Sequence, residues 1–379
     1  MSGATPPPGR DHGWGDGNAH ERRYVVFDAL RCLAAAVVLY GHALNLFVAS
    51  PGHGAPLWIK LAHFPAAFGQ QAVIAFFVLS GFWISKGVAE RQAQGCWNWS
   101  AYAIDRLSRL WMVLIPALLV GGTLDLLSLN LARFPYSALG PTILGGDFAQ
   151  RLTPVAFFGN LLFLQKLLVP LFGSNTALWS LANEFWYYLW FPVLVGLALR
   201  RVSLAPTLAA AASLVAFPSL LPGFACWLCG ALLYAAQVRW CPPRWAAWPA
   251  IVLGTVVLIA IRWRTNGADL PVAGVVALVL WCSADTDVRV IRPLAAFGRQ
   301  ASYSLYVCHI PVLTLAAGLL LSGSRLPICG WSLLATVGLC AVVIAYAWIF
   351  SRLTEAHTAT VRRWIRAVSR ATVRSPAPS

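Results

Sequence analysis

Long apolar runs recur along most of this 379-residue chain, and they constrain its fold more than any other feature. A helix needs about 20 apolar residues to cross a bilayer. Only 11% of the residues are charged and 59% are hydrophobic, whereas soluble globular domains are about 25% charged. We therefore predict an all-α polytopic protein that has the lipid bilayer as its partner.

The apolar runs predict about ten transmembrane helices. They lie at 25–49, 67–88, 107–129, 177–199, 204–221, 223–238, 246–261, 270–284, 301–321 and 331–351. A further stretch, 155–172, contains Asn160, Gln165, Lys166 and Pro170. Polar side chains and a proline fit a re-entrant or surface segment better than a helix that faces lipid, so we do not count it as a span.

The basic residues predict the orientation. With ten spans and a cytoplasmic N-terminus, twenty of the 28 Lys and Arg residues fall on the cytoplasmic side and seven on the outer side. Such a bias is typical of membrane proteins and places both termini in the cytoplasm. The formal net charge of +15 comes from short basic clusters between apolar runs. Nucleic-acid binding needs those charges gathered on one soluble surface, so we expect no nucleic-acid partner.

Composition divides the chain into three parts. Residues 1–23 are rich in Gly, Pro and polar side chains and lack an apolar core, which predicts a disordered cytoplasmic head and no signal peptide. Residues 24–352 form the membrane domain, and 353–379 form a basic cytoplasmic tail. The nine cysteines lie mostly in apolar runs, so we expect no required disulfide and no metal site, including at Cys226 and Cys229.

Ionisable residues inside predicted spans are candidates for function, because burying a charge in lipid is costly. The first span contains Asp28, Arg31 and His42. Arg31 and His42 share a helix face about 16 Å apart along the axis. Two structural interpretations stay open: Arg31 paired with Asp28 at the membrane interface, and His42 as a hydrogen-bonded core residue.

Glu184 lies in the fourth predicted span, about as far from its outer end as His42 lies from the outer end of the first. Equal depth predicts that the Glu184 carboxylate orients and stabilises the His42 imidazole as a general base. The alternative is a structural role for Glu184, paired with an arginine or a backbone amide.

Two further groups complete the candidate site. Arg106 and Arg109 are spaced i,i+3 at the cytoplasmic edge of the third span, where two guanidinium groups suit a phosphate or pyrophosphate, or act only as topology signals. The ninth span carries further residues that we expect to line the site: Tyr303, Ser304, Tyr306 and His309. The alternative for the two tyrosines is that they form an aromatic belt. Motifs for nucleotide binding, zinc proteases and serine hydrolases are absent from the sequence.

Together these residues resemble the integral membrane acyltransferase 3 family, and the resemblance runs from Asp28 to about Arg352. It rests on five ordered motifs: Asp28, Leu30, Arg31, Gly41 and His42; FFVLSGFWIS at 76–85; Arg106 and Arg109; WSLANEFWYYL at 179–189; and SYSLYVCHIP at 302–311. Met112 replaces a proline that the family often has. The closing Glu-basic-Pro motif is only partly matched by Glu355, Ala356 and His357, so no role is assigned there.

The resemblance implies an O-acyltransferase in the plasma membrane, the inner membrane of a bacterium, in the stand-alone form without an SGNH hydrolase-like domain. No cofactor is bound permanently. Acetyl-CoA or another acyl-CoA is the expected donor, held by Arg31, Arg106 and Arg109. A hydroxyl of a cell-surface or lipid-linked carbohydrate is the expected acceptor. His42 acts as general base or carries the acyl group, with Glu184 orienting it, and Tyr303 or Ser304 donates to the oxyanion.

Two other functions fit part of the same pattern. A proton-coupled transporter or flippase of a glycan or small solute would use His42, Glu184 and His309 as a relay. A passive scaffold in a glycan-export complex would need none of these side chains. Neither accounts for the arginine pair or for the ordered motifs.

Overall fold

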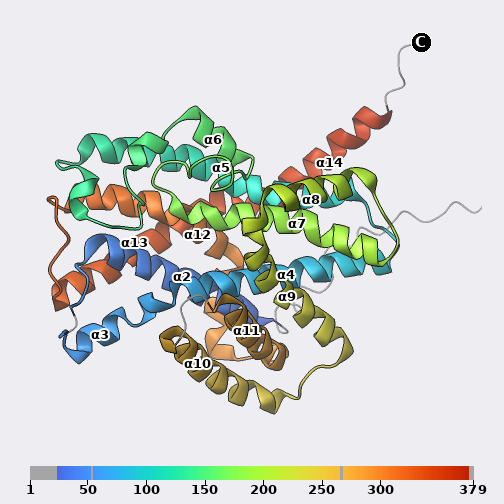
Figure 1. Cartoon of the computed structure of the whole chain (residues 1–379), viewed down its shortest axis with the longest axis horizontal. Coiled ribbons are helices and arrows are strands. Elements are labelled where there is room, and N and C mark those ends of the chain that lie inside the picture. Colours follow the sequence, from blue (N-terminus) through green and yellow to red (C-terminus); the bar gives the residue numbers. More distant parts are fainter. Residues whose placement is uncertain (1–23, 53, 265–267, 375–379) are drawn as a thin grey trace, which may run out of the picture.

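The computed structural model of the chain describes residues 24–52, 54–264 and 268–374, so the predicted head and the last residues of the tail lie outside it. Those described residues are helical, apart from connecting segments and isolated bridges, and contain no strand. The longer helices run side by side along the long axis of the molecule (Figure 1). The helices are α2 (Val25–Phe47), α3 (Leu57–His63), α4 (Gly69–Ala93), α5 (Trp99–Leu131), α6 (Pro154–Leu161), α7 (Trp179–Ala198), α8 (Leu204–Ala216), α9 (Leu221–Arg239), α10 (Ala247–Arg264), α11 (Asp269–Ser283), α12 (Arg292–Leu320), α13 (Gly330–Leu353) and α14 (Thr358–Arg374).

The all-helical class is confirmed, and each of the ten predicted spans coincides with one helix among α2, α4, α5 and α7–α13. Among the described residues, seven segments are long and apolar enough to cross a membrane. The helices α8 and α11 are shorter, with 13 and 15 residues, and α7 mixes its apolar residues with Asn, Glu and Tyr. The count of ten and the cytoplasmic placement of the termini stay predictions.

The centre of the bundle is formed by α12 and its neighbours α2, α5 and α13. Gly298 of α12 lies against the backbone of α2, where a Cβ atom would come within 1.9 Å of the Asp28 carbonyl oxygen. A second close contact joins α9 to α4, because a Cβ atom on Gly230 would meet the Val78 carbonyl oxygen at the same distance. Such glycines let helix backbones approach closely, which is the main source of packing energy between helices in lipid.

The stretch at 155–172 is not a span. It folds into the eight-residue helix α6 and then a tight hairpin with a bridge between Gln165 and Val169. Asn160 holds this hairpin through bonds to the Pro170 carbonyl (2.9 Å) and the Phe172 amide (3.2 Å). The buried Gln165 donates to the Leu178 carbonyl (2.9 Å). Asn160 therefore satisfies part of the irregular backbone of this stretch, as burial requires, and Gln165 attaches the stretch to the beginning of α7.

The segment before α7 is attached to the middle of the bundle. The buried Asp125 of α5 accepts hydrogen bonds from the Ser174 amide (2.7 Å) and hydroxyl (2.6 Å). The next residue, Asn175, donates to the Val307 carbonyl of α12 (2.7 Å). Because Val307 lies in the middle of α12, the helix α7 begins well inside the bundle.

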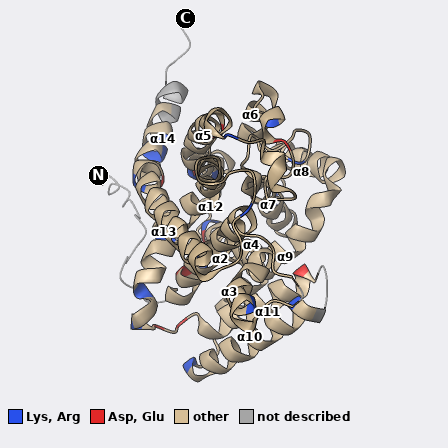
Figure 2. Ribbon diagram, turned by 90° about the vertical axis from the view of Figure 1, so that its left-hand side faces the viewer, with Lys and Arg blue, Asp and Glu red and all other residues tan. Residues whose placement is uncertain are grey.

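The tail contains α14, which packs against α5 and extends from the end of the bundle (Figure 1). Its basic residues form a band along the helix in Figure 2. Asp105 of α5 is buried and pairs with Arg362 (3.8 Å), with Arg366 and with Arg91. Below, the end of the bundle near α14 is called the α14 end, and the opposite end, near α3, the α3 end.

Candidate active site

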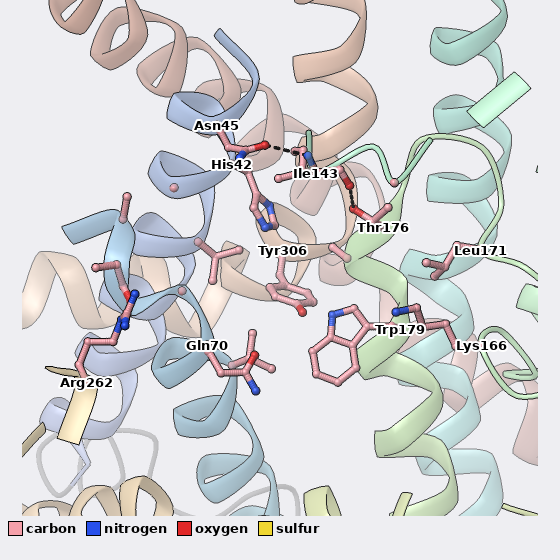
Figure 3. A pocket seen from close by; sticks show the side chains of 18 of the residues that line it. His42, Asn45, Gln70, Ile143, Lys166, Leu171, Thr176, Trp179, Arg262 and Tyr306 are labelled. Atoms are coloured by element: carbon pink, nitrogen blue, oxygen red, sulfur yellow. Dashed lines mark hydrogen bonds between the residues drawn. The ribbon is translucent and has the colours of Figure 1, made fainter. Parts of the chain in front are cut away.

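A cavity of about 670 Å³ lies toward the α3 end, between α2, α4, α12 and the beginning of α7. His42, Gln70, Trp179 and Tyr306 are among its lining residues, and their side chains point into it in Figure 3. Its volume falls within the range of about 300–1,000 Å³ that is usual for small-molecule sites. The cavity is therefore large enough for a sugar-sized substrate.

His42 is hydrogen-bonded to His309. The two residues come from the first and ninth predicted spans, and His42 Nδ1 lies 2.8 Å from His309 Nε2. The buried His309 is fixed in turn, because its Nδ1 lies 3.0 Å from the Leu305 carbonyl oxygen and 2.9 Å from that of Tyr306. We call these two residues the histidine pair.

The partners of the histidine pair assign its protons. A carbonyl oxygen only accepts hydrogen bonds, so the proton of neutral His309 lies on Nδ1 and its Nε2 is an acceptor. His42 must then donate through Nδ1, which leaves Nε2 of His42 with a free lone pair. Since His42 lines the cavity, the pair presents a hydrogen-bond acceptor, and hence a base, to a bound substrate.

Tyr306 places a hydroxyl in the same cavity. It lies one turn before His309 on α12, and its oxygen accepts a hydrogen bond from Ser180 Oγ (2.8 Å). Because that bond uses the tyrosine oxygen as acceptor, its own proton is available to a ligand. The wall opposite is fixed by the Ile143 backbone, whose amide donates to Asn45 (2.7 Å) and whose carbonyl accepts from Thr176 (2.9 Å), as Figure 3 shows.

The predicted pairing of Glu184 with His42 is wrong. Among the described residues, His42 is hydrogen-bonded to His309, and Glu184 accepts from the Tyr188 hydroxyl (3.2 Å). The prediction assumed that α7 begins at the outer membrane face. Trp179, the first residue of α7, already lines the cavity beside His42. Glu184 is five residues further along and therefore lies about 7 Å deeper.

The second polar region contains the three arginines that the sequence predicts as donor-binding residues. We call Arg31, Arg106 and Arg109 the arginine cluster. Arg109 lies close enough to Arg31 and Arg106 for their like charges to repel one another. Arg106 lies over the Tyr102 ring, 5.5 Å from its centre, and its Nε is buried without a hydrogen-bond partner. Arg109 forms no hydrogen bond or ion pair within the described part of the chain, so the cluster has free capacity for an anion.

Arg31 is also paired as the structural interpretation predicted. Asp28 lies 3.4 Å from Arg31 and 3.1 Å from Arg299 of α12. The Arg31 guanidinium also lies 5.7 Å from the centre of the Trp83 ring. Asp28 therefore joins the beginning of α2 to α12 and positions Arg31, instead of lining the cavity.

Two carboxylates face the arginine cluster. Glu184 interacts electrostatically with Arg31 and Arg109, and Glu355 does the same. Glu355 lies in the short turn between α13 and α14 and accepts a hydrogen bond from Ser304 Oγ (2.9 Å). The sequence analysis assigned Glu355 no role, although the partial Glu-basic-Pro match pointed to this position.

Tyr303 and Ser304 do not line the cavity. The Tyr303 hydroxyl lies 3.5 Å from the Leu110 carbonyl of α5, and Ser304 donates to Glu355. Both precede His309 on α12 by more than a turn, toward the α14 end. The predicted oxyanion donor is therefore wrong in position, and Tyr306 is the hydroxyl of this helix that lines the cavity.

Three basic residues that the sequence analysis treated only as charges of the outer loops also line the cavity. They are Arg151, Lys166 and Arg262. Their convergence depends on long-range folding, so sequence spacing gave no sign of it. Among the described residues, no group of three His, Cys, Asp or Glu side chains could hold a metal ion.

Comparison with known proteins identifies the family of the chain. A family model described as an acyltransferase domain, of the acyltransferase 3 type, matches residues 24–352. No curated protein and no solved structure matches the chain. The matched region contains the histidine pair, the arginine cluster and the seven segments that could cross a membrane, apart from the end of the last one. The chain therefore belongs to the acyltransferase 3 family, and it is a multi-pass integral membrane acyltransferase.

Proposed function

We propose that this protein transfers an acyl group, most simply acetyl, from acyl-CoA to a hydroxyl of a cell-surface or lipid-linked carbohydrate, in a bacterial inner membrane. The observation that carries the proposal is the free Nε2 of His42 in a sugar-sized cavity. Family membership supports acyl transfer. The geometry of the histidine pair supports a hydroxyl as the acceptor, because a neutral alcohol needs a base.

The proposed reaction uses His42 as its base. Nε2 takes the proton of the acceptor hydroxyl while the hydroxyl oxygen attacks the thioester carbonyl carbon. The Tyr306 hydroxyl donates to the oxygen that becomes negatively charged. The carbon–sulfur bond then breaks, the ester is released, and the CoA sulfur takes the proton from His42. Attack of Nε2 itself on the thioester, followed by transfer to the acceptor, would use the same atom.

The donor is proposed to bind at the arginine cluster. The phosphates of CoA need several charge-assisted hydrogen bonds, and the buried Nε of Arg106 is an unused donor. Arg31 and His42 lie on one face of α2, about 16 Å apart along its axis. An extended thioester arm would cross that distance and bring the acyl carbon to the cavity. A positive cluster at the α14 end also agrees with a donor that enters from the cytoplasm.

The acceptor is proposed to bind in the cavity. Asn45 and Gln70 offer side-chain amides, and Trp179 offers a flat aromatic surface. A few polar groups among apolar and aromatic walls are typical of pockets for small ligands. Because the cavity is at the α3 end, an acceptor there would approach from the side opposite to the donor.

The direct test measures acyl transfer from labelled acetyl-CoA by membranes that contain the full-length protein, with mass spectrometry of total glycans and lipids to find the product. The His42→Ala variant removes the base, and we expect the rate to fall by about a hundredfold to ten-thousandfold. Insertion and stability of the variant are checked by detergent extraction and thermal unfolding. Full transfer by a correctly inserted variant would refute the assignment of His42.

The same preparation separates acyl transfer from transport. A transporter would move a solute across sealed vesicles in response to a pH gradient and form no acylated product. Stabilisation of the protein by CoA, together with an acylated product, supports the enzyme. Solute flux without any product would favour the transporter.

A further inference from the structure

The cavity is lined by three cations that come from three separate elements. Arg151 follows the loop after α5, Lys166 lies in the hairpin after α6, and Arg262 lies in the last turn of α10. No Asp or Glu is among the described residues that line the cavity. The predicted topology places only seven basic residues on this side of the bundle. Three of the seven at a single site form a concentration of positive charge that membrane orientation does not explain.

Two of these cations are uncompensated. Lys166 has no ion pair or hydrogen bond to its side chain within the described structure, and it is exposed. Arg262 uses Nε to donate to the Ala67 carbonyl (2.7 Å), so its terminal nitrogens have no partner among the described residues. Arg151 differs, because it donates to the Leu144 carbonyl and interacts with Asp125 and Asp147. A further acidic residue contacts the cavity wall, since Asp269 accepts from Gln70 (3.1 Å).

The two uncompensated cations lie on opposite sides of the cavity. Figure 3 shows Lys166 beside Trp179 and Arg262 across from it, with Tyr306 and Gln70 between them. Lys166 has a left-handed backbone (φ 59°), which is uncommon for a residue other than glycine. Its amide hydrogen bond to the Val169 carbonyl (2.8 Å) closes the hairpin that presents the side chain. Two cations that face one space attract an anion placed between them, and salt weakens this attraction because Lys166 is exposed.

We propose that the acceptor is an anionic carbohydrate, with a phosphate or a carboxylate that pairs with Lys166 or Arg262 while its hydroxyl faces His42. This inference rests on the proposed function for the presence of an acceptor hydroxyl, but the selection for negative charge is a property of the cavity itself. Phosphate and carboxylate are both recognised by charge-assisted hydrogen bonds from arginine and lysine. A neutral sugar would leave both cations unpaired.

The test compares binding of three small probes to the full-length protein in phosphatidylcholine nanodiscs, which contain no anionic lipid and no sugar detergent. The probes are glucose, glucose 1-phosphate and glucuronate, measured by calorimetry at low and high salt. We expect both anions to bind at least tenfold more tightly than glucose, and their affinity to fall as salt rises. The preferred anion then tells a phosphate-bearing acceptor from one that carries a carboxylate.

Four single variants and one double variant locate the effect. Lys166→Gln and Arg262→Gln should each weaken binding of the preferred anion about tenfold when they contact it, and the double variant should lose the preference over glucose. Arg262→Lys keeps the charge without the bond to Ala67, so it should keep the preference for the anion over glucose. Arg133→Gln, an exposed cation that does not line the cavity, is the matched control and should change nothing.

Specific outcomes would overturn the inference. Equal binding of all three probes, or an unchanged preference in the double variant, would show that the cations do not select the acceptor. Binding of CoA that weakens in the double variant, with binding of glucose 1-phosphate unchanged, would assign the cations to the donor. None of these results depends on catalysis, so a failure here is distinct from a failure of His42→Ala to impair acyl transfer.

Discussion

The histidine pair lies on α2 and α12, and the arginine cluster lies on α2 and α5. The two regions share α2 but are held in place by different forces. The histidine pair is fixed by hydrogen bonds among neutral groups that end on two backbone carbonyls. The arginine cluster is held near carboxylates of both α7 and the turn after α13. The hydrogen bonds of the histidine pair determine which ring nitrogen carries a proton. The carboxylates near the arginine cluster determine its net charge.

The difference has a chemical consequence. A base must be neutral to accept a proton, and burial among neutral hydrogen-bond partners favours the neutral form of an imidazole. A binding site for a polyanion instead needs excess cations, with enough carboxylates nearby to limit the repulsion between them. The two regions should therefore respond differently to mutation, one in kcat and the other in the KM for the donor.

After the loss of rate expected for His42→Ala, the largest expected effect comes from breaking the arginine cluster. In Arg106→Ala combined with Arg109→Ala, the donor loses at least two charge-assisted hydrogen bonds, each of about 1.5–3 kcal/mol. We expect the KM for acyl-CoA to rise about a hundredfold or more, with a much smaller change in the KM for the acceptor. Steady-state kinetics with both substrates varied would measure this. An unchanged dependence on acyl-CoA would contradict binding of the donor there.

A smaller effect is expected from His309, which positions His42 without touching substrate. His309→Ala removes the acceptor for His42 Nδ1, and we expect kcat to fall roughly tenfold while both KM values stay near those of the wild type. His309→Gln retains an acceptor oxygen, so it should recover part of the loss. Equal loss in both variants, or a loss that appears only in thermal stability, would indicate a packing role.

The smallest expected effect comes from Glu184→Gln, and it separates the histidine pair from the arginine cluster most clearly. Glu184→Gln keeps the hydrogen bond with Tyr188 and removes a charge that faces Arg31 and Arg109. We expect the KM for acyl-CoA to change by a few-fold and kcat to stay nearly constant. A large fall in kcat without an effect on the donor would restore Glu184 as the partner of His42. Tyr188→Phe is a matched control, since it removes the same hydrogen bond and leaves the charge.

Much of the fold follows from local sequence, because a helix in lipid needs only a long apolar run. The helix limits follow less well. Predicted starts at 107 and 301 miss the first turns of α5 and α12, which begin at Trp99 and Arg292. Those turns contain polar residues that hydropathy excludes, and a cap at Asn98 starts α5 (2.8 Å to the Ala101 amide).

The site could be predicted in part for a similar reason. Arg31, Arg106, Arg109, His42 and His309 stand out because charged or ionisable groups are costly in spans. Their partners could not be found in this way. The position of Glu184 along the bundle depends on the hydrogen bonds between Asp125 and Ser174, which place the beginning of α7 inside the bundle. Lys166 and Arg262 line one cavity only after the chain has folded the hairpin and α10 onto its two sides.

The contact of Gly298 with Asp28 has a further consequence for the histidine pair. It joins α2 and α12 at a point that lies, along α2, about four helical turns from the hydrogen bond between His42 and His309. A helix attached at two such points along its length cannot rotate about its own axis. The base is then aimed before either substrate arrives, so the protein bears the entropic cost of orientation when it folds instead of during each turnover.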